Sequence, residues 1–429
     1  MNHRFDAIVV GAGPAGSAAA YMLARKGAKV LCLERGEYPG AKNVSGGILY
    51  GEPFQDLADN EKGEWPRERR IVKHVLAMAA GNNFTSFTYQ RMGGEAPLAF
   101  SVLRAGFDRW LSARARQAGA RILTEAPVDE VIWKNGRAVG VKVRRPEGDI
   151  FAPCVILADG ANSLLGKKAG LRADYKAGQM SLAVKEVIKL SKETIDARFG
   201  LNAEEGAAFS IIGEATHGLE GGAFLYTNRE SLSLGLVCHM DALVREKVKI
   251  RTLLDRFKQI PWISALIQGG VFKEYSAHLI PTLGFRERPR PFTHGILVAG
   301  DAAGFTLNTG FQVRGMDFAL ASGTAAAETV LDAHQKGDFS SKTMAAYENR
   351  LKDGYIRKDL KTFRRMEAAM KNRALYAVYP KVIGEAFADL YLGAGKPKKR
   401  MGRLLWDHLR SYRGLRDLVK DLFFLRRFL

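Results

Sequence analysis

The chain has 429 residues, of which 47% are hydrophobic and 26% are charged, a composition typical of a globular protein with two or three subdomains. It contains no run of about 18 apolar residues, so no membrane-spanning helix is predicted. Its three cysteines are widely separated, which excludes a disulfide framework and a self-contained four-cysteine iron–sulfur cluster and favours a reducing, cytosolic compartment.

The net charge of +20 is concentrated toward the C-terminus, where residues 331–429 hold 23 Lys and Arg against 11 Asp and Glu. A basic surface can bind nucleic acid, an anionic membrane or an acidic protein. No nucleic-acid module is recognisable, so nucleic acid is the least favoured of the three. The first predicted strand starts within five residues of Met1, which leaves no room for a signal peptide.

A glycine motif opens the chain. The apolar run Phe5–Val10 predicts a buried strand, and the sequence Gly11-Ala12-Gly13-Pro14-Ala15-Gly16 follows it directly. Gly11 permits a tight turn, Gly13 lets the backbone approach a pyrophosphate, and Gly16 lets the next helix pack closely on the strand. That helix is predicted over residues 15–25, with its N-terminus toward the phosphates.

An acidic residue completes the unit. A second strand, residues 29–33, ends on Glu34, whose carboxylate can accept hydrogen bonds from a ribose hydroxyl. A lone GxGxxG is weak, but here the strand, the glycines, the helix and the acid occur in the expected order. The sequence therefore predicts a dinucleotide site.

A glycine-rich loop follows at residues 35–51 and includes Arg35, Gly46 and Gly47. Such a loop can lie flat against a planar ligand, or it can be an ordinary surface loop. Residues 52–100 show no strong periodicity and support no firm prediction.

The next segment predicts a strand at residues 101–104 that ends in Arg104, then a helix over 107–118 and a strand over 121–123. Strands at 128–133 and 138–144 flank Asn135-Gly136, a strong hairpin signal. A buried strand within 153–160 leads to Asp159, which either contacts a ligand or caps the next helix.

Residues 175–275 are rich in predicted strands, at 181–188, 222–226 and 232–238. The last of these alternates polar and apolar residues, as expected for an antiparallel sheet with one covered face. This region is predicted to be the substrate half of a two-part enzyme.

A third glycine–acid element follows at residues 295–304, where a strand ends in Gly300-Asp301. A helix is predicted from about Val313 to Ala333. The aspartate can bond a sugar hydroxyl and the helix N-terminus can stabilise negative charge, although Asp301 can also be a simple helix cap. Beyond residue 334 the chain is predicted to be helical. Residues 396–429 carry 11 Lys and Arg against three Asp and Glu and predict an amphipathic basic helix pair.

The order of three motifs, GxGxxG…E, ADG and AGDAAG, resembles that found in the FAD-binding fold of p-hydroxybenzoate hydroxylase and geranylgeranyl reductase. The chain most resembles electron transfer flavoprotein–quinone oxidoreductases, and among them FixC-type flavoprotein subunits. The resemblance rests on four further segments, at residues 40–47, 221–228, 275–278 and 314–317.

The resemblance implies an α/β fold with a Rossmann-like FAD-binding domain of the glutathione-reductase/hydroxylase type. Its implied ranges are 1–50, 100–170 and 276–333. An antiparallel quinone domain would comprise 51–99 and 171–275, and a helical basic region 334–429. The chain lacks the cysteines of the C-terminal cluster domain found in single-chain relatives.

The resemblance also implies residue roles. Glu34 would bind the adenosine ribose, and the backbone at Val128 would lie near the adenine. Arg104 and Asp301 would lie by the pyrophosphate and ribityl chain. Gly315-Met316 would face the flavin N1–C2=O edge, where reduction builds negative charge. The quinone headgroup would approach beside Gly221 and Gly222.

FixC-type subunits work with a two-subunit electron transfer flavoprotein and a small ferredoxin-like iron–sulfur subunit. The implied function is therefore the quinone-side dehydrogenase of an NADH-oxidising, bifurcating complex, with possible membrane-surface contact through the basic C-terminus. The cofactor carries the electrons, so no catalytic base and no metal site are predicted. His239, His278 and His294 are candidate proton shuttles, of which His278 is favoured. A flavin monooxygenase, a prenyl-chain reductase and a non-catalytic flavin-bearing scaffold remain alternatives.

Overall fold

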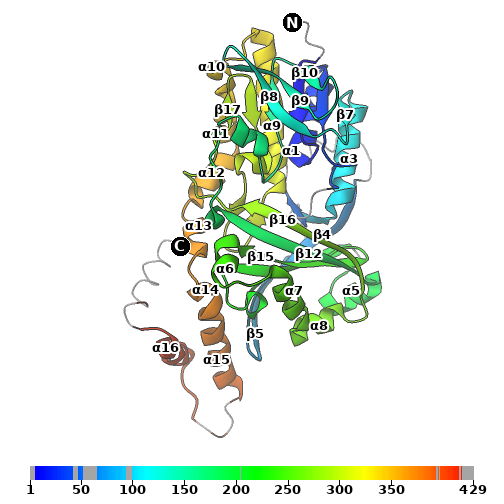
Figure 1. Ribbon diagram of the computed structural model, residues 1–429. Coiled ribbons are helices and arrows are strands. Elements are labelled where there is room, and N and C mark those ends of the chain that lie inside the picture. Colours follow the sequence, from blue (N-terminus) through cyan, green and yellow to red (C-terminus); the bar gives the residue numbers. More distant parts are fainter. Residues whose placement is uncertain are drawn as a thin grey trace.

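The computed structural model describes residues 5–41, 47–51, 65–92, 99–202, 204–392, 395, 397–414 and 417. The chain forms two lobes, each built around one sheet, and its C-terminal helices run from the first lobe along the second (Figure 1). Among these residues, no helix combines the length and the apolarity that crossing a bilayer requires.

The first lobe contains a six-stranded sheet in the order β17-β18-β11-β1-β2-β7. Its strands are β1 (Ala7–Val10), β2 (Val30–Leu33), β7 (Arg121–Leu123), β11 (Val155–Leu157), β17 (Phe292–Thr293) and β18 (Ile296–Val298). All neighbours are parallel except β17 and β18. The carboxyl ends of β1, β2, β11 and β18 therefore meet at one edge, which brings the three sequence motifs together.

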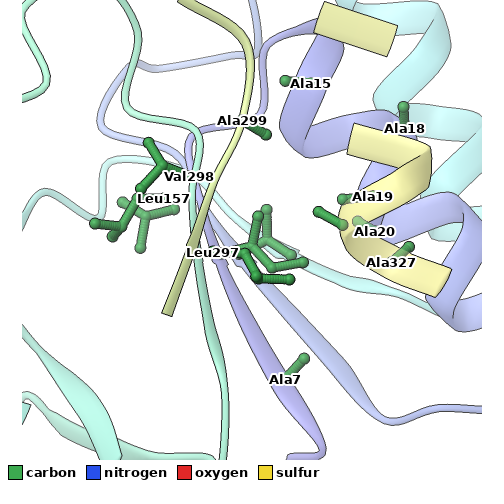
Figure 2. Packing of buried hydrophobic residues seen from close by; sticks show 14 of the residues in the cluster. Ala7, Ala15, Ala18, Ala19, Ala20, Leu157, Leu297, Val298, Ala299 and Ala327 are labelled. Atoms are coloured by element: carbon green, nitrogen blue, oxygen red, sulfur yellow. The ribbon is translucent and has the colours of Figure 1, made fainter. Parts of the chain in front are cut away.

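Close helix packing covers this sheet. The helices are α1 (Pro14–Arg25), α3 (Arg104–Gln117) and α9 (Met316–Lys336). Figure 2 shows Leu297 of β18 on the side of the strands that faces Ala19 and Ala20 of α1 and Ala327 of α9, with Leu157 and Val298 on the other side. The small side chains let the two helices approach so closely that a Cβ on Gly323 would lie 2.1 Å from the carbonyl oxygen of Ala15.

A three-stranded antiparallel sheet also packs on β11. It comprises β8 (Val128–Lys134), β9 (Arg137–Val143) and β10 (Asp149–Phe151). Asn135 and Gly136 connect β8 and β9 with φ of 51° and 72°, so the predicted hairpin is confirmed.

The second lobe holds a nine-stranded sheet in the order β16-β12-β15-β14-β13-β4-β6-β3, with β5 paired to β4. Its strands are β3 (Ile48–Tyr50), β4 (Arg67–Ala80), β5 (Asn83–Gln90), β6 (Ala99–Val102), β12 (Met180–Lys189), β13 (Glu205–Gly213), β14 (Gly221–Thr227), β15 (Ser231–His239) and β16 (Val271–Pro281). The sheet is antiparallel except where β4 pairs with β13. Because β4 and β13 run parallel, the sheet is mixed rather than purely antiparallel.

One face of this sheet is covered by α5 (Lys192–Phe199), α7 (Ile250–Gln259) and α8 (Pro261–Ile267). Leu232, Leu234 and Leu236 of β15 are fully buried against that layer, as their alternation predicts. The opposite face turns toward the first lobe.

Two features differ from the sequence expectations. The long hairpin β4–β5 lies in the segment that showed no clear period, because β4 has several charged residues and breaks in its register. The predicted FAD-domain ranges 1–50, 100–170 and 276–333 also contain parts of the large sheet. These parts are β3, most of β6 and the part of β16 after Ser276.

The C-terminal helices divide between the lobes. Helices α10 (Ser341–Met344), α11 (Ala346–Asp353) and α12 (Tyr355–Thr362) complete the core of the first lobe, where the hydroxyl of buried Tyr347 donates to the Val298 carbonyl at 3.0 Å. Helices α13 (Met366–Met370), α14 (Ala374–Ala377) and α15 (Tyr379–Leu392) follow the second lobe.

The basic tail contributes helix α16 (Met401–Tyr412), which packs on α15. Leu404 is its single buried residue, and Trp406 is 39% exposed. Residues 415–429, apart from 417, lie outside the part of the chain that the structure describes, so the second helix of the predicted pair is not assigned.

Candidate functional site

A cavity of about 910 Å³ lies between the carboxyl edge of the first sheet and the open face of the large sheet. Its size is within the range of ligand and cofactor sites. The candidate residues that line it are Gly11, Gly13, Pro14, Ala15, Glu34, Arg35, Gly47, Arg104, Val128, Asp159, Gly221, Gly222, Gly300, Asp301, Gly315 and Met316. Gly16 does not line the cavity, and Gly46 lies outside the described residues.

The glycine loop forms one end of the cavity. Gly11 has a φ of 97°, and a Cβ on Gly16 would lie 1.8 Å from the Gly11 carbonyl oxygen, so Gly16 allows the helix to touch the turn. A Cβ on Gly13 would meet no atom within 4 Å, because this residue faces the cavity. The N-terminus of α1 begins directly after Gly13 and supplies the partial positive charge that phosphates favour.

Glu34 is buried beside that loop. Its two carboxylate oxygens accept hydrogen bonds from the amides of Ala12, at 2.9 Å, and Gly36, at 2.6 Å. Each oxygen has a second lone pair, and the side chain lines the cavity. The residue therefore fixes the loop and retains the capacity to accept from sugar hydroxyls.

Arg104 is the first residue of α3 and not the end of a strand, so the sequence prediction was wrong there. Its guanidinium is buried and donates to Asp108 in a bidentate pair, through Nε at 2.9 Å and Nη2 at 2.8 Å. Such a pair fixes a planar cation at the cavity wall.

Asp301 lies in the 3₁₀ turn η4 (Gly300–Ala303), close enough to Arg104 for their charges to interact. Burial raises the pKa of Asp301, and the Arg104 guanidinium acts in the opposite direction. An aspartate held at this strand end can accept a hydrogen bond from a ligand hydroxyl.

Replacing Asp301 with alanine is expected to weaken FAD binding at least tenfold. A hydrogen bond to a charged group contributes about 1.5–3 kcal/mol. Titration of the apoprotein with FAD, followed by flavin fluorescence, measures the change. An unchanged dissociation constant would reduce Asp301 to a structural role in the turn.

Asp159 fits both interpretations that the sequence left open. Its Oδ2 accepts from the amide of Leu165 at 3.1 Å and so caps α4 (Leu164–Lys168). Its Oδ1 is buried without a hydrogen-bond partner in the described chain, and burial raises the pKa of the carboxyl. A free buried acceptor at a cavity wall fits a ligand hydroxyl.

Helix α9 points its N-terminus at the same cavity. It begins at Met316 and not at Val313, because Val313–Arg314 (β20) pairs with Leu307–Asn308 (β19). Gly315 precedes the helix, and both Gly315 and Met316 line the cavity. The dipole of a 21-residue helix therefore meets a ligand at that position with partial positive charge.

The large sheet supplies an aromatic wall that the sequence did not reveal. Phe224 and Tyr226 alternate along β14 and stack with ring centroids 4.9 Å apart. A Cβ on Gly47 would lie 2.2 Å from the Tyr226 ring, so this glycine lets the loop lie on the aromatic wall. Gly221 and Gly222 are the first two residues of β14, and both line the cavity.

The three histidines occupy different environments. His278 lines the cavity, but burial together with the nearby Arg104 and Arg35 lowers its pKa to about 4. His239 also lines the cavity. His294 does not, and its Nδ1 accepts from the amide of Ser341 at 3.1 Å.

The cavity has three features that fit FAD. Two helix N-termini face it, the glycine loop leaves room for a pyrophosphate, and one buried carboxylate oxygen of Asp159 has no partner in the described chain. The fold and this cavity define an FAD-dependent oxidoreductase. A family model described as FAD dependent oxidoreductase matches residues 6–204, and the ETF-QO/FixC family C-terminal domain matches residues 366–429. The chain belongs to the family of FixC proteins and electron transfer flavoprotein–quinone oxidoreductases.

Curated relatives match almost the whole chain. Protein FixC of Salmonella typhi is 41% identical over 422 residues, covering 97% of each sequence. A probable electron transfer flavoprotein–quinone oxidoreductase of Escherichia coli strain K12 is 38% identical with the same coverage. Among solved structures, a geranylgeranyl bacteriochlorophyll reductase-like protein from Thermoplasma acidophilum has a TM-score of 0.74 at 20% identity, covering 97% of this chain and 98% of that one. That likeness shows a shared fold.

Proposed function

We propose that this chain accepts electrons from an electron transfer flavoprotein and passes them to quinone, as the quinone-side subunit of an NADH-oxidising, bifurcating complex. The match of its C-terminal region to the ETF-QO/FixC domain supports the proposal. Bound FAD would supply the two-electron chemistry, while the protein would hold the cofactor, shape the quinone site and control access of water.

The observation that carries this proposal is the extension of the cavity past the glycine loop onto the sheet. Residues of β12, β13, β14 and β15 line that half, including the stacked pair Phe224 and Tyr226. At its mouth lie Phe87, Tyr89 and Phe311, which are 57%, 59% and 68% exposed. Aromatic side chains in the cavity and at its exposed rim suit a flat ring with a hydrocarbon chain.

The proposed FAD contacts follow the cavity from one end to the other. Glu34 would accept from the adenosine ribose and the Val128 backbone would lie near the adenine. Gly11, Gly13, Pro14, Ala15 and Arg35 would surround the pyrophosphate. Arg104, Asp159, Gly300 and Asp301 would hold the pyrophosphate and ribityl chain, and Gly47, Gly315 and Met316 the flavin ring. All of these residues line the cavity.

The proposed quinone slot lies beside Gly221 and Gly222. A Cβ on Gly221 would lie 2.2 Å from the Val237 carbonyl oxygen, whereas one on Gly222 would lie 3.2 Å from that of Ile211. The first glycine is required by backbone packing. The second is less crowded and lines the cavity, so a quinone ring is proposed to lie against it.

The proposed partners are the two subunits of the electron transfer flavoprotein, a small ferredoxin-like iron–sulfur subunit and quinone. The basic C-terminal segment is proposed to bring the flavin to an anionic membrane surface, where each nearby basic residue contributes about 1 kcal/mol. The exposed Trp406 on the weakly buried helix α16 supports this role.

A protein truncated after Gly395 is expected to retain FAD and lose salt-sensitive binding to anionic liposomes. Its cavity is built entirely from earlier residues, whereas the lost segment carries 11 Lys and Arg. Flotation with liposomes at low and high salt measures the effect, and the FAD content is the control. Undiminished flotation would rule out membrane docking through this segment.

Reoxidation of the chemically reduced flavoprotein tests the proposed function. A short-chain ubiquinone analogue under anaerobic conditions is expected to restore the oxidised flavin spectrum rapidly, while oxygen alone reacts slowly. Fast reaction with oxygen and none with quinone would favour a monooxygenase instead.

A further inference from the structure

Quinone reduction to quinol consumes two protons as well as two electrons. A fully reduced flavin would carry one of these protons, and the proposed function leaves the source of the second open. Burial first, and then Arg104 and Arg35, lower the pKa of His278 to about 4, and no carboxylate among the described residues opposes that shift. Two other titratable side chains line the cavity on the side where α13 and α14 meet the end of the large sheet. They are the imidazole of His239 and the carboxyl of Glu367, and the phenol of Tyr376 lies on the same side.

His239 ends β15 next to the proposed quinone slot. Its amide donates at 3.0 Å to the carbonyl of Glu220, the residue that precedes Gly221. The side chain is 6% exposed, and its Nδ1 has no hydrogen-bond partner within the described chain. Burial lowers the pKa of His239, the Asp241 and Glu220 carboxylates oppose that shift, and Lys371 adds to it. A neutral imidazole has one nitrogen that donates and one that accepts.

Glu367 reaches the cavity from α13. It is half-buried, so its side chain both lines the cavity and retains some exposure to solvent. Burial raises the pKa of Glu367 to about 7, with Arg288 and Lys371 opposing and Glu287 adding to the shift. At neutral pH the carboxyl is therefore available in both protonation states.

The two side chains share their surroundings. The Lys371 ammonium, which donates to the Gly178 carbonyl at 2.8 Å, acts electrostatically on both His239 and Glu367. Tyr376 of α14 also lines the cavity, and its pKa is raised by burial and then by the Glu220 and Glu367 carboxylates. Its hydroxyl donates to the Met370 carbonyl at 2.9 Å.

We propose that Glu367 takes up one proton from solvent and that His239 passes one proton to the quinone; this inference rests on the proposed function. Conversion of quinone to quinol takes two electrons and two protons, and a fully reduced flavin would supply both electrons and one of the protons. His239 would give its N–H proton to the remaining quinone oxygen, and water in the cavity that both side chains line would carry a proton from Glu367 to the other ring nitrogen. Solvent would then reprotonate Glu367.

The test follows reoxidation of the reduced, full-length flavoprotein by a short-chain ubiquinone analogue as a function of pH. The rate is expected to fall as the pH rises through about 7, because Glu367 then loses the proton that it donates. Glu367→Gln and His239→Gln should each slow the reaction at least tenfold and flatten the pH profile. Glu367→Asp should restore part of both.

Two controls separate proton transfer from general damage. Reoxidation by ferricenium requires no proton and should stay unchanged in both variants. Glu287→Gln removes an exposed carboxylate charge that raises the pKa of Glu367 without lining the cavity. It should keep the original rate at low pH and move the pH profile slightly to lower pH. Without turnover, infrared difference spectra of the resting protein should show a protonated carboxyl band that titrates near pH 7 and disappears in Glu367→Gln.

Unchanged quinone rates and pH slopes in the two variants would overturn the proton route and leave the proposed function intact. Failure of the original protein to react with quinone at all would overturn both. If a variant also loses its reaction with ferricenium, the infrared titration of the original protein decides. Absence of a carboxyl band that titrates near pH 7 in the original protein would contradict the route.

Discussion

Replacing Gly13 with valine is expected to give a folded but colourless protein. The new side chain would meet no protein atom at its Cβ, and the φ of −73° at Gly13 suits any residue, so folding is not opposed. The side chain would instead occupy the cavity in front of α1, where the pyrophosphate is proposed to lie. We expect FAD affinity to fall by at least about 100-fold, equivalent to about 2.8 kcal/mol.

Two control variants separate loss of FAD from loss of folding. Gly402→Val adds the same side chain where a Cβ also meets no atom, but on α16, and should retain FAD. Gly16→Val places a Cβ 1.8 Å from the Gly11 carbonyl oxygen and should prevent folding. Circular dichroism and the ratio of flavin to protein absorbance measure both properties. Stoichiometric FAD in Gly13→Val would show that the phosphates lie elsewhere.

Replacing Gly222 with leucine is expected to abolish quinone reduction and spare reduction of the flavin by the electron transfer flavoprotein. The leucine side chain would fill the proposed quinone slot, whereas the FAD contacts lie toward the first lobe. Because a displacement of about 1 Å can cost about 100-fold in rate, we expect at least that loss in the quinone half-reaction.

Gly222→Ala serves as the graded control, since its methyl group would lie 3.2 Å from the Ile211 carbonyl oxygen and requires a small local adjustment. It should retain most of the quinone rate. Stopped-flow absorbance at the flavin band measures the two half-reactions separately. Equal loss of both in Gly222→Leu would indicate misfolding, and equal retention would place the quinone elsewhere.

The dinucleotide-binding unit could be predicted from the sequence because its signals are local. The run from Ala7 to Glu34 folds as strand, helix and strand in the predicted order. Strand pairing then brings Asp159 and Asp301 to the same edge. The AGDAAG segment was found for the same reason, although the start of α9 shifted where β20 paired with β19.

The second half of the cavity could not be predicted in this way. Phe224 and Tyr226 face the cavity because β14 pairs with β13 and β15, and alternation in a strand does not reveal which face is covered. Glu367 reaches the cavity through packing of α13 near residues far away in sequence, such as Arg288. Arg104 was assigned to a strand because the boundary between a strand and the helix after it lacks a strong cap signal.

Electrons are proposed to enter this chain from an electron transfer flavoprotein and to leave it to quinone. Anaerobic reduction of the purified flavoprotein, first by NADH alone and then by NADH with the electron transfer flavoprotein present, tests this electron path. We predict that NADH alone leaves the flavin oxidised, that adding the electron transfer flavoprotein bleaches it rapidly, and that a ubiquinone analogue then restores it. Rapid bleaching by NADH alone would contradict entry of electrons through the electron transfer flavoprotein.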